Sequence, residues 1–154
     1  KKLQMVFDEG LYDPANEPDI AYAHLFSYFR GEEWRTQKET QRLLDKYFTT
    51  KPNGIPGNDD TGTMSAWAIF NMIGFYPDCP GLPEYTLTTP VFNKVTIRLD
   101  PKWYKEKELV IESNRTQPGT LYINKVLLNG KKFNQYRITH DELVHSQRIL
   151  FDLK

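Results

Sequence analysis

Residues 63–77, TMSAWAIFNMIGFYP, decide the fold class, because the hydrophobic period changes within them. Apolar residues recur at helical spacing at the start of this stretch, which predicts a helix from about Thr63 to Ile73. The positions spaced for burial are Met64, Trp67, Ala68 and Met72. Gly74 is a natural helix stop, and strand-like segments follow from Phe75 onwards. The sequence therefore predicts an α+β fold with helices first and strands after them.

Two further helices are predicted before this stretch. Asn16 is a possible N-cap of the first, and Pro18 and Asp19 suit its opening turn. Two apolar stripes at i, i+4 and i+7 predict that this helix is buried over a wide arc. They consist of Tyr22, Phe26 and Phe29, and of Ala21, Leu25 and Tyr28.

Gly31 ends the first helix, and residues 32–48 predict the second. Four apolar side chains are expected to pack inward: Leu43, Leu44, Tyr47 and Phe48. The charged residues Glu39 and Asp45, among Lys38, Arg42 and Lys46, are interpreted as a solvated outer face. Residues 49–62 are rich in proline, glycine and asparagine, which predicts a loop.

The C-terminal half is predicted to be an antiparallel β module. Its strands are expected at residues 85–87, 91–99, 108–113 and 149–153. Asn129-Gly130, between residues 121–128 and 131–133, is a strong two-residue hairpin signal. Thr139 and Glu142 have the spacing of a capping box for one short helix.

Composition narrows the classes of partner. The chain has 20 basic and 20 acidic residues, so its net charge is zero. This balance provides no electrostatic reason to expect a nucleic acid or an anionic membrane as a partner. No segment approaches the roughly 20 uninterrupted apolar residues that a membrane-spanning helix needs.

The segment GNDDTGTM, residues 57–64, is the most informative candidate site. Two adjacent carboxylates, Asp59 and Asp60, directly precede a predicted helix, whose N-terminus stabilises negative charge. Carboxylate oxygens held there can bind a hard cation or accept a proton from water. The structural alternative is that one aspartate simply caps the helix, alone or together with Thr61.

Other candidates are equally open to a structural reading. The segment NEPD, residues 16–19, needs no functional explanation if it only starts a helix. Trp34 and Trp103 could stack on sugar rings or on neighbouring side chains.

Several segments in the same order resemble glycoside hydrolase family 92, the calcium-dependent exo-α-mannosidases. They are NEPDIAY (16–22), WRTQ (34–37), GNDDTG (57–62), MSAW (64–67), GFYP (74–77), PVFNKV (90–95), LNGK (128–131) and ITHD (138–141). The resemblance implies that residues 1–76 are the last helices of an (α/α)6 catalytic barrel. Residues 77–154 would then be the antiparallel β-strand module that follows the barrel.

The resemblance also implies a chemistry and its residues. Family members remove terminal mannose from α-linked mannosides, and α-1,2 linkages are the expected substrates here. Hydrolysis inverts the anomeric carbon and is assisted by a bound Ca²⁺. By this resemblance Asp60 is the expected catalytic base and Asp59 the supporting catalytic carboxylate. Asn16 and Glu17 are expected to bind the substrate, and Asn58 and Asp60 to ligate the metal.

The resemblance sets limits on the chain as well. The family's general acid belongs to a segment upstream of residue 1, so the chain alone is expected to be inactive and to need that missing part. His24 stands where the family often has a tyrosine, which could alter the pocket wall. A periplasmic or secreted location is implied by resemblance. The alternative functions are a non-catalytic carbohydrate-binding module and a purely structural C-terminal domain.

Overall fold

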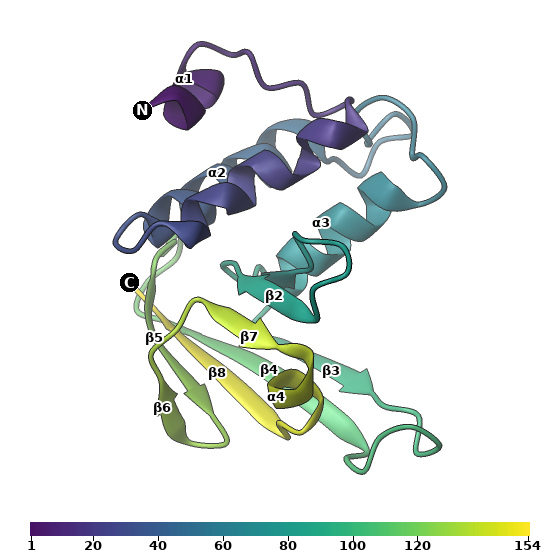
Figure 1. Cartoon of the computed structure of the whole chain (residues 1–154), viewed down its shortest axis with the longest axis vertical. Helices are drawn as coiled ribbons and strands as arrows, with labels where there is room; N and C mark the ends of the chain where they lie inside the picture. Colours follow the sequence, from purple (N-terminus) through teal and green to yellow (C-terminus); the bar gives the residue numbers. More distant parts are fainter.

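A computed structural model describes every residue from Lys1 to Lys154. Its helices gather on one side of the molecule and its sheets on the other (Figure 1). The helical layer contains α1 (Lys2–Asp8), η1 (Glu17–Tyr28), α2 (Glu33–Tyr47) and α3 (Thr63–Ile73). A fifth, short helix, α4 (His140–Val144), lies among the strands. The α+β class predicted from the sequence is confirmed. No helix combines the length and the apolar character needed to cross a bilayer.

The first predicted helix forms, but as the 3₁₀ helix η1. Its three residues per turn put Ile20, Ala23 and Phe26 on one face, against the helical core. The predicted stripes at α-helical spacing are therefore partly wrong, since Tyr28 and Phe29 stay 48% and 60% exposed. Asn16 precedes the helix as predicted, but its side chain accepts no capping hydrogen bond.

Helix α2 matches its prediction closely, except for Glu39. This carboxylate is only 1% exposed and does not lie on a solvated face. Gln4 of α1 donates a hydrogen bond to it (3.4 Å), and Arg42 Nε lies 2.8 Å from its Oε2. The interpretation as a solvated face holds for Arg42, Asp45 and Lys46, which are exposed, and is wrong for Glu39, because α1, which has no clear pattern of its own, packs a polar partner against it.

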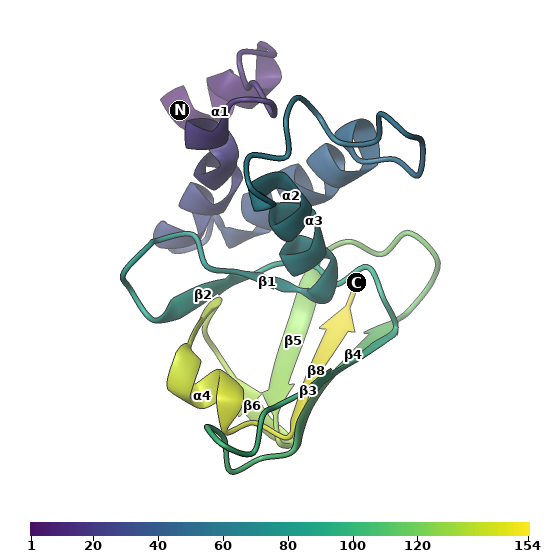
Figure 2. The ribbon, with the colours of Figure 1, turned by 90° about the vertical axis from the view of Figure 1, so that its right-hand side faces the viewer.

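Helix α3 begins and ends where its period predicted. Met64, Trp67 and Ala68 are buried, and Gly74 ends the helix with a φ of +116°. A Cβ at Gly74 would lie 3.2 Å from Cβ of Pro90, so both backbone and space favour glycine. The chain then runs straight from α3 into a strand (Figure 2).

The strands form two sheets. The three-stranded sheet has the order β1-β2-β7, and the five-stranded sheet the order β3-β4-β8-β5-β6. The strands of the first sheet are β1 (Phe75–Tyr76), β2 (Glu84–Leu87) and β7 (Arg137–Thr139). Those of the second are β3 (Lys94–Arg98), β4 (Glu108–Arg115), β5 (Ile123–Leu128), β6 (Lys131–Phe133) and β8 (Arg148–Leu153).

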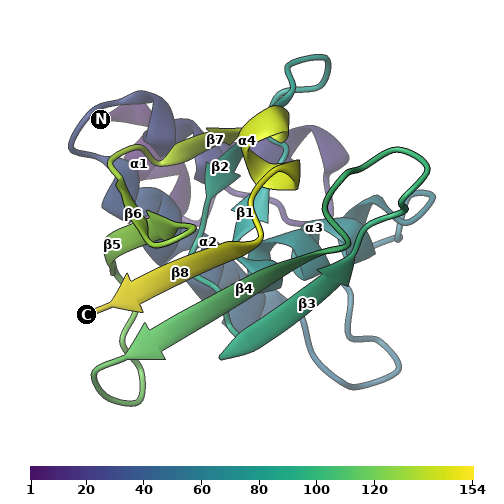
Figure 3. The ribbon, with the colours of Figure 1, turned by 90° about the horizontal axis from the view of Figure 1, so that it is seen from below.

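The prediction of a purely antiparallel module was wrong. Strands β4 and β8 pair in parallel, with Ile111 opposite Ile149 and Ser113 opposite Phe151 (Figure 3). A parallel pair needs a long crossover, and β5, β6, β7 and α4 supply it. Local patterning cannot reveal this pairing, because both strands alternate in the same way as antiparallel ones.

Two local signals in the β half are confirmed. Asn129 (φ +49°) and Gly130 (φ +80°) form the predicted hairpin turn between β5 and β6. Thr139 and Glu142 form the predicted capping box at the start of α4. The predicted strand 91–99 is shorter than expected and begins only at Lys94.

The structure contains two hydrophobic cores. One, in the helices, is built around Phe7, Leu43 and Trp67, and the other lies under the five-stranded sheet around Ile111, Ile149 and Phe151. A buried hydrogen bond joins the layers, from the backbone N–H of Ile123 to the side-chain oxygen of Gln37 (2.9 Å). The division at residue 76 into two domains stays a prediction.

Candidate active site

The loop that contains Asp59 and Asp60 lies directly against the segment that precedes Asn16. Gly57 has a φ of +65°, and a Cβ built on it would sit 2.7 Å from Cβ of Ala15. Only glycine allows this approach without a shift of backbone or neighbour. The structure thus brings together the two segments, about 40 residues apart, that hold the predicted site residues.

Asp59 caps helix α3. One carboxylate oxygen accepts the backbone N–H of Ser65 (2.7 Å), and the other accepts the Ser65 hydroxyl (2.8 Å). The residue at the N-cap position, Gly62, has no side chain, so this carboxylate satisfies a first-turn N–H from upstream. The structural alternative raised for an aspartate in this loop therefore holds for Asp59.

Asp60 has a different environment. It and Thr61 adopt left-handed conformations (φ +45° and +60°), which are costly for residues other than glycine. The backbone carbonyl of Asp60 accepts the hydroxyl of Thr63 (2.7 Å) and its N–H (3.2 Å). Its side chain is exposed and makes no hydrogen bond or ion pair within the chain. The strained turn therefore holds a free carboxylate at the surface, as many functional sites do.

The remaining predicted site residues lie at the surface as well. Asn58, Asn16 and Glu17 are all exposed. Glu17 lies near enough to Tyr76 to affect its phenol: burial raises the pKa of Tyr76 to about 12, with smaller contributions from the charges of Asp78 and Glu17. Exposed oxygen groups around a narrow contact can bind a polar ligand, but they need further groups to enclose it.

The two helix starts are anchored to each other beneath the surface. Trp67 Nε1 of α3 donates to the carbonyl of Ile20 in η1 (2.9 Å). The indole also stacks on Phe48, with 5.4 Å between ring centroids. Rigid packing of this kind fixes the position of the loop residues above it.

His24 does not line a pocket wall, which corrects the expectation for this position. It is fully buried, stacks on Tyr76 (4.4 Å between centroids), and its Nε2 lies 2.9 Å from Oδ1 of Asn71. Asn71 Nδ2 donates to Trp67 O, so its Oδ1 accepts and His24 Nε2 carries the proton. Burial lowers the pKa of His24, which favours the neutral ring.

The oxygen groups of the candidate site are of the type that Ca²⁺ binds, but they are too few to form a complete ligand shell. Carboxylate and amide oxygens are the ligands that Ca²⁺ prefers, usually six to eight of them. Within the chain no three His, Cys, Asp or Glu side chains come together in a way that could hold a metal. Asn58 and Asp60 could supply only part of such a shell.

One buried ion pair was not foreseen from the sequence. Asp78 has a fully buried carboxylate, which accepts from Arg137 (3.2 Å) and from the hydroxyl of Thr86 (2.8 Å). The Arg137 guanidinium also lies over the ring of Tyr28, 4.3 Å from its centroid. This cluster joins η1 to the three-stranded sheet. Its partners are so far apart in sequence that no local spacing could have revealed it.

The two candidate tryptophans lie outside this loop contact. Trp34, in α2, packs edge-on against Tyr122, with ring centroids 6.2 Å apart. Trp103 is 72% exposed and lies in the β3–β4 connection, at the opposite end of the molecule from the α2–α3 loop that contains Asp60 (Figures 1 and 2). A sugar platform beside Asp60 is therefore not formed by either ring within this chain.

Comparison with known proteins identifies the family. The glycosyl hydrolase family 92 catalytic domain matches residues 1–154. The chain belongs to this family. A GH92 α-mannosidase from Bacteroides thetaiotaomicron, solved with mannoimidazole, is 31% identical and superposes with a TM-score of 0.84 over 93% of this chain and 18% of its own.

Two other relatives agree with this assignment. The GH92 inverting mannosidase from Bacteroides thetaiotaomicron VPI-5482 is 33% identical, with a TM-score of 0.82, over 98% of this chain and 20% of its own. An uncharacterised secreted glycosidase from Arthroderma benhamiae is 28% identical over 91% of this chain and 18% of its own length. The GH92 chain thus spans about a fifth of these relatives.

Proposed function

We propose that this chain is part of an α-mannosidase and carries the part of its active site that contains the catalytic base. The observation that carries the proposal is the strained turn at Asp60, which holds an unpaired carboxylate beside the segment of Asn16 and Glu17. Family membership and the name of the inverting mannosidase relative support the same reaction class. The substrates would be mannose-containing glycans, with α-1,2-linked mannosides as the first choice.

In this proposal the two aspartates have separate roles. Asp60 takes a proton from the water that attacks the anomeric carbon, as the base of an inverting glycosidase does. Asp59, whose oxygens are occupied by Ser65, positions the turn by tying it to the start of α3. Asn16 and Glu17 bind sugar hydroxyls from the facing segment. The general acid comes from the part of the longer protein outside residues 1–154.

Calcium would be shared between this chain and other groups. Asn58 and Asp60 are the proposed protein ligands, and further oxygens would come from the rest of the protein, from water and from the sugar. When bound, the ion would hold and orient the sugar hydroxyls. A carboxylate that ligates Ca²⁺ is less available as a base, so the test must measure both roles of Asp60.

The test uses the full-length protein and α-1,2-mannobiose, with mannose release as the readout. Asp60→Asn is expected to lower turnover by roughly 10²–10⁴-fold, the usual contribution of a general base. Asp8→Asn, at an exposed position of α1, is the control and should retain turnover. Proton NMR should detect β-mannose as the first product, because inversion converts the α linkage. Unchanged turnover of Asp60→Asn would move the base to another residue.

Calorimetric titration of the same variants with Ca²⁺ separates the two roles. If Asp60 is also a ligand, Asp60→Asn and Asn58→Ala should both bind Ca²⁺ more weakly than wild type. If Asp60 acts only as the base, its variant should lose turnover and retain calcium affinity. Chelation of wild type should abolish turnover in either case, and turnover that survives chelation would contradict the assignment of calcium.

The alternative is a non-catalytic carbohydrate-binding or structural domain. For the isolated chain, the capping role of Asp59 and the incomplete metal shell favour this non-catalytic alternative. The isolated chain is expected to release no mannose, since it lacks the acid. Glycan binding by the chain that survives substitution of both aspartates would support the binding module. We also propose a periplasmic or secreted location, in line with the secreted relative.

A further inference from the structure

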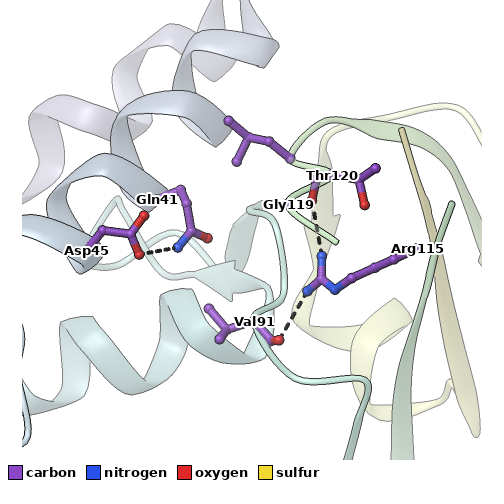
Figure 4. Close-up of a pocket in the computed structure, with 7 residues that line it drawn as sticks. Gln41, Asp45, Val91, Arg115, Gly119 and Thr120 are labelled. Carbon is purple, nitrogen blue, oxygen red and sulfur yellow. Dashed lines mark hydrogen bonds between the residues drawn. The ribbon is translucent and has the colours of Figure 1, made fainter. Parts of the chain in front are cut away.

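A cleft between the two layers shares no residue with the candidate active site. It encloses about 340 Å³ and is open to solvent between α2 and the end of β4 (Figure 4). Gln41 and Asp45 line it from α2, and Arg115 faces them from the sheet layer. The rest of the lining consists of Val91, Gly119, Thr120 and Leu121.

The sheet side of the cleft is held rigidly. Arg115 donates to the carbonyls of Thr120 (3.2 Å) and Val91 (3.1 Å), and also to that of Pro90. These three bonds leave two of the five N–H groups of a guanidinium free. All three partners are neutral carbonyls, and Arg115 makes no ion pair within the chain. A fixed donor with remaining capacity is pre-organised for a ligand.

The helix side offers oriented acceptors. Gln41 Nε2 donates to Oδ1 of Asp45 (2.8 Å), which orients the carboxylate. Asp45 makes no ion pair within the chain, either with Arg115 or with any other cation. Its second oxygen and the amide oxygen of Gln41 remain free to accept hydrogen bonds.

The lining indicates the chemical class of ligand. One carboxylate and one guanidinium face each other, so neither an anion nor a cation is favoured by net charge. Hydroxyl groups can accept from the guanidinium and donate to the carboxylate at the same time. Val91 and Leu121 add apolar surface suited to the C–H face of a sugar ring. The volume lies at the lower end of the roughly 300–1,000 Å³ range of small-molecule sites.

We propose that this cleft is an additional carbohydrate-binding site, which takes one neutral sugar unit of a glycan. Asp45, Gln41 and Arg115 bind its hydroxyls. The assignment to a polyhydroxylated ligand rests on the lining alone. The choice of a mannoside as the first probe rests on the proposed function.

Saturation-transfer NMR on the full-length protein tests this site, with methyl α-mannoside and methyl α-glucoside as probes. One equivalent of mannoimidazole, the ligand of a solved relative, is added first to occupy the proposed active site. A signal from either glycoside should persist, and it should become at least about tenfold weaker in Asp45→Ala, as expected when a hydrogen bond to a charged group is lost.

The chain offers a matched control. Gln4 and Asp8 of α1 form the same i, i+4 hydrogen bond (2.8 Å) outside the cleft, so Asp8→Ala should leave the signal unchanged. Thermal unfolding and mannobiose hydrolysis by Asp45→Ala should match wild type. A signal that is absent from wild type with both probes, or that survives in Asp45→Ala, would overturn the site. If wild type releases no mannose from mannobiose, the proposed function is contradicted. The saturation-transfer result for the cleft would still hold in that case.

Discussion

The helical layer and the five-stranded sheet are stabilised in different ways. The core under the sheet consists of apolar side chains such as Ile111, Ile149 and Phe151, each 1% exposed. The helical core has buried polar groups beside it, among them the neutral His24 and the carboxylate of Glu39. Another buried carboxylate, that of Asp78, lies next to the three-stranded sheet.

This difference assigns separate tasks to the two layers. Apolar packing is insensitive to pH, so the sheet can serve as a stable support for the helical layer. The helical layer depends in part on hydrogen bonds of buried polar groups, and it carries the strained turn of the candidate active site. Stability variants should therefore differ in both size and pH dependence between the layers.

The largest loss of stability is expected in the sheet core. Phe151→Ala should lower the free energy of unfolding by about 3–5 kcal/mol, because it removes a fully buried ring and leaves a cavity. Urea denaturation should show this loss equally at pH 5.5 and pH 7.5. Leu82→Ala, at a position that is 43% exposed, is the control and should change little. A strong pH dependence of the Phe151 effect would break the distinction between the layers.

The buried ion pair should give a loss of similar or smaller size. Asp78→Ala removes the carboxylate that pairs with Arg137, which should cost about 3 kcal/mol. Glu84 lies 3.2 Å from the same guanidinium and still compensates part of the charge of Arg137 in the variant. The expected loss is therefore at the lower end of the range for breaking a buried ion pair. A double-mutant cycle with Arg137→Met measures the coupling. Additive effects of the two substitutions would show that the pair contributes no coupling energy.

Acid should weaken the helical layer through His24. Burial lowers the pKa of His24 in the folded protein, so below about pH 6.5 the unfolded chain binds more protons than the folded one. The free energy of unfolding should then fall as the pH drops, by at most about 1.4 kcal/mol per pH unit from this group. Urea denaturation between pH 7.5 and 5 measures the slope. His24→Phe should reduce the slope, and an unchanged slope would exclude His24 as its source.

The smallest effects should separate the two aspartates. Asp59→Ala should cost about 1 kcal/mol, because the carboxylate that caps α3 is lost. Asp60→Asn should change the free energy of unfolding by no more than about 0.5 kcal/mol, since its side chain has no partner and asparagine tolerates the left-handed conformation. Equal losses for both variants would contradict their separate roles.

Local physical signals were sufficient for many elements of this protein. The period of residues 63–73, followed by glycine, predicted α3 with its observed bounds. Asn129-Gly130 and the pair Thr139 and Glu142 predicted a hairpin and a cap, because these features depend on neighbouring residues only. The motif GNDDTG, taken with the others, was also sufficient to identify the family.

Tertiary structure decided the features that depend on distant partners. Burial of Glu39 required α1, and the parallel pairing of β4 with β8 required the crossover between them. The resemblance already implied separate roles for the two adjacent aspartates, but only the tertiary structure showed that Asp59 is hydrogen-bonded to Ser65 while the side chain of Asp60 has no partner. The contact between Gly57 and Ala15 likewise exists only in three dimensions, because backbone conformation and packing, and not sequence spacing, bring these segments together.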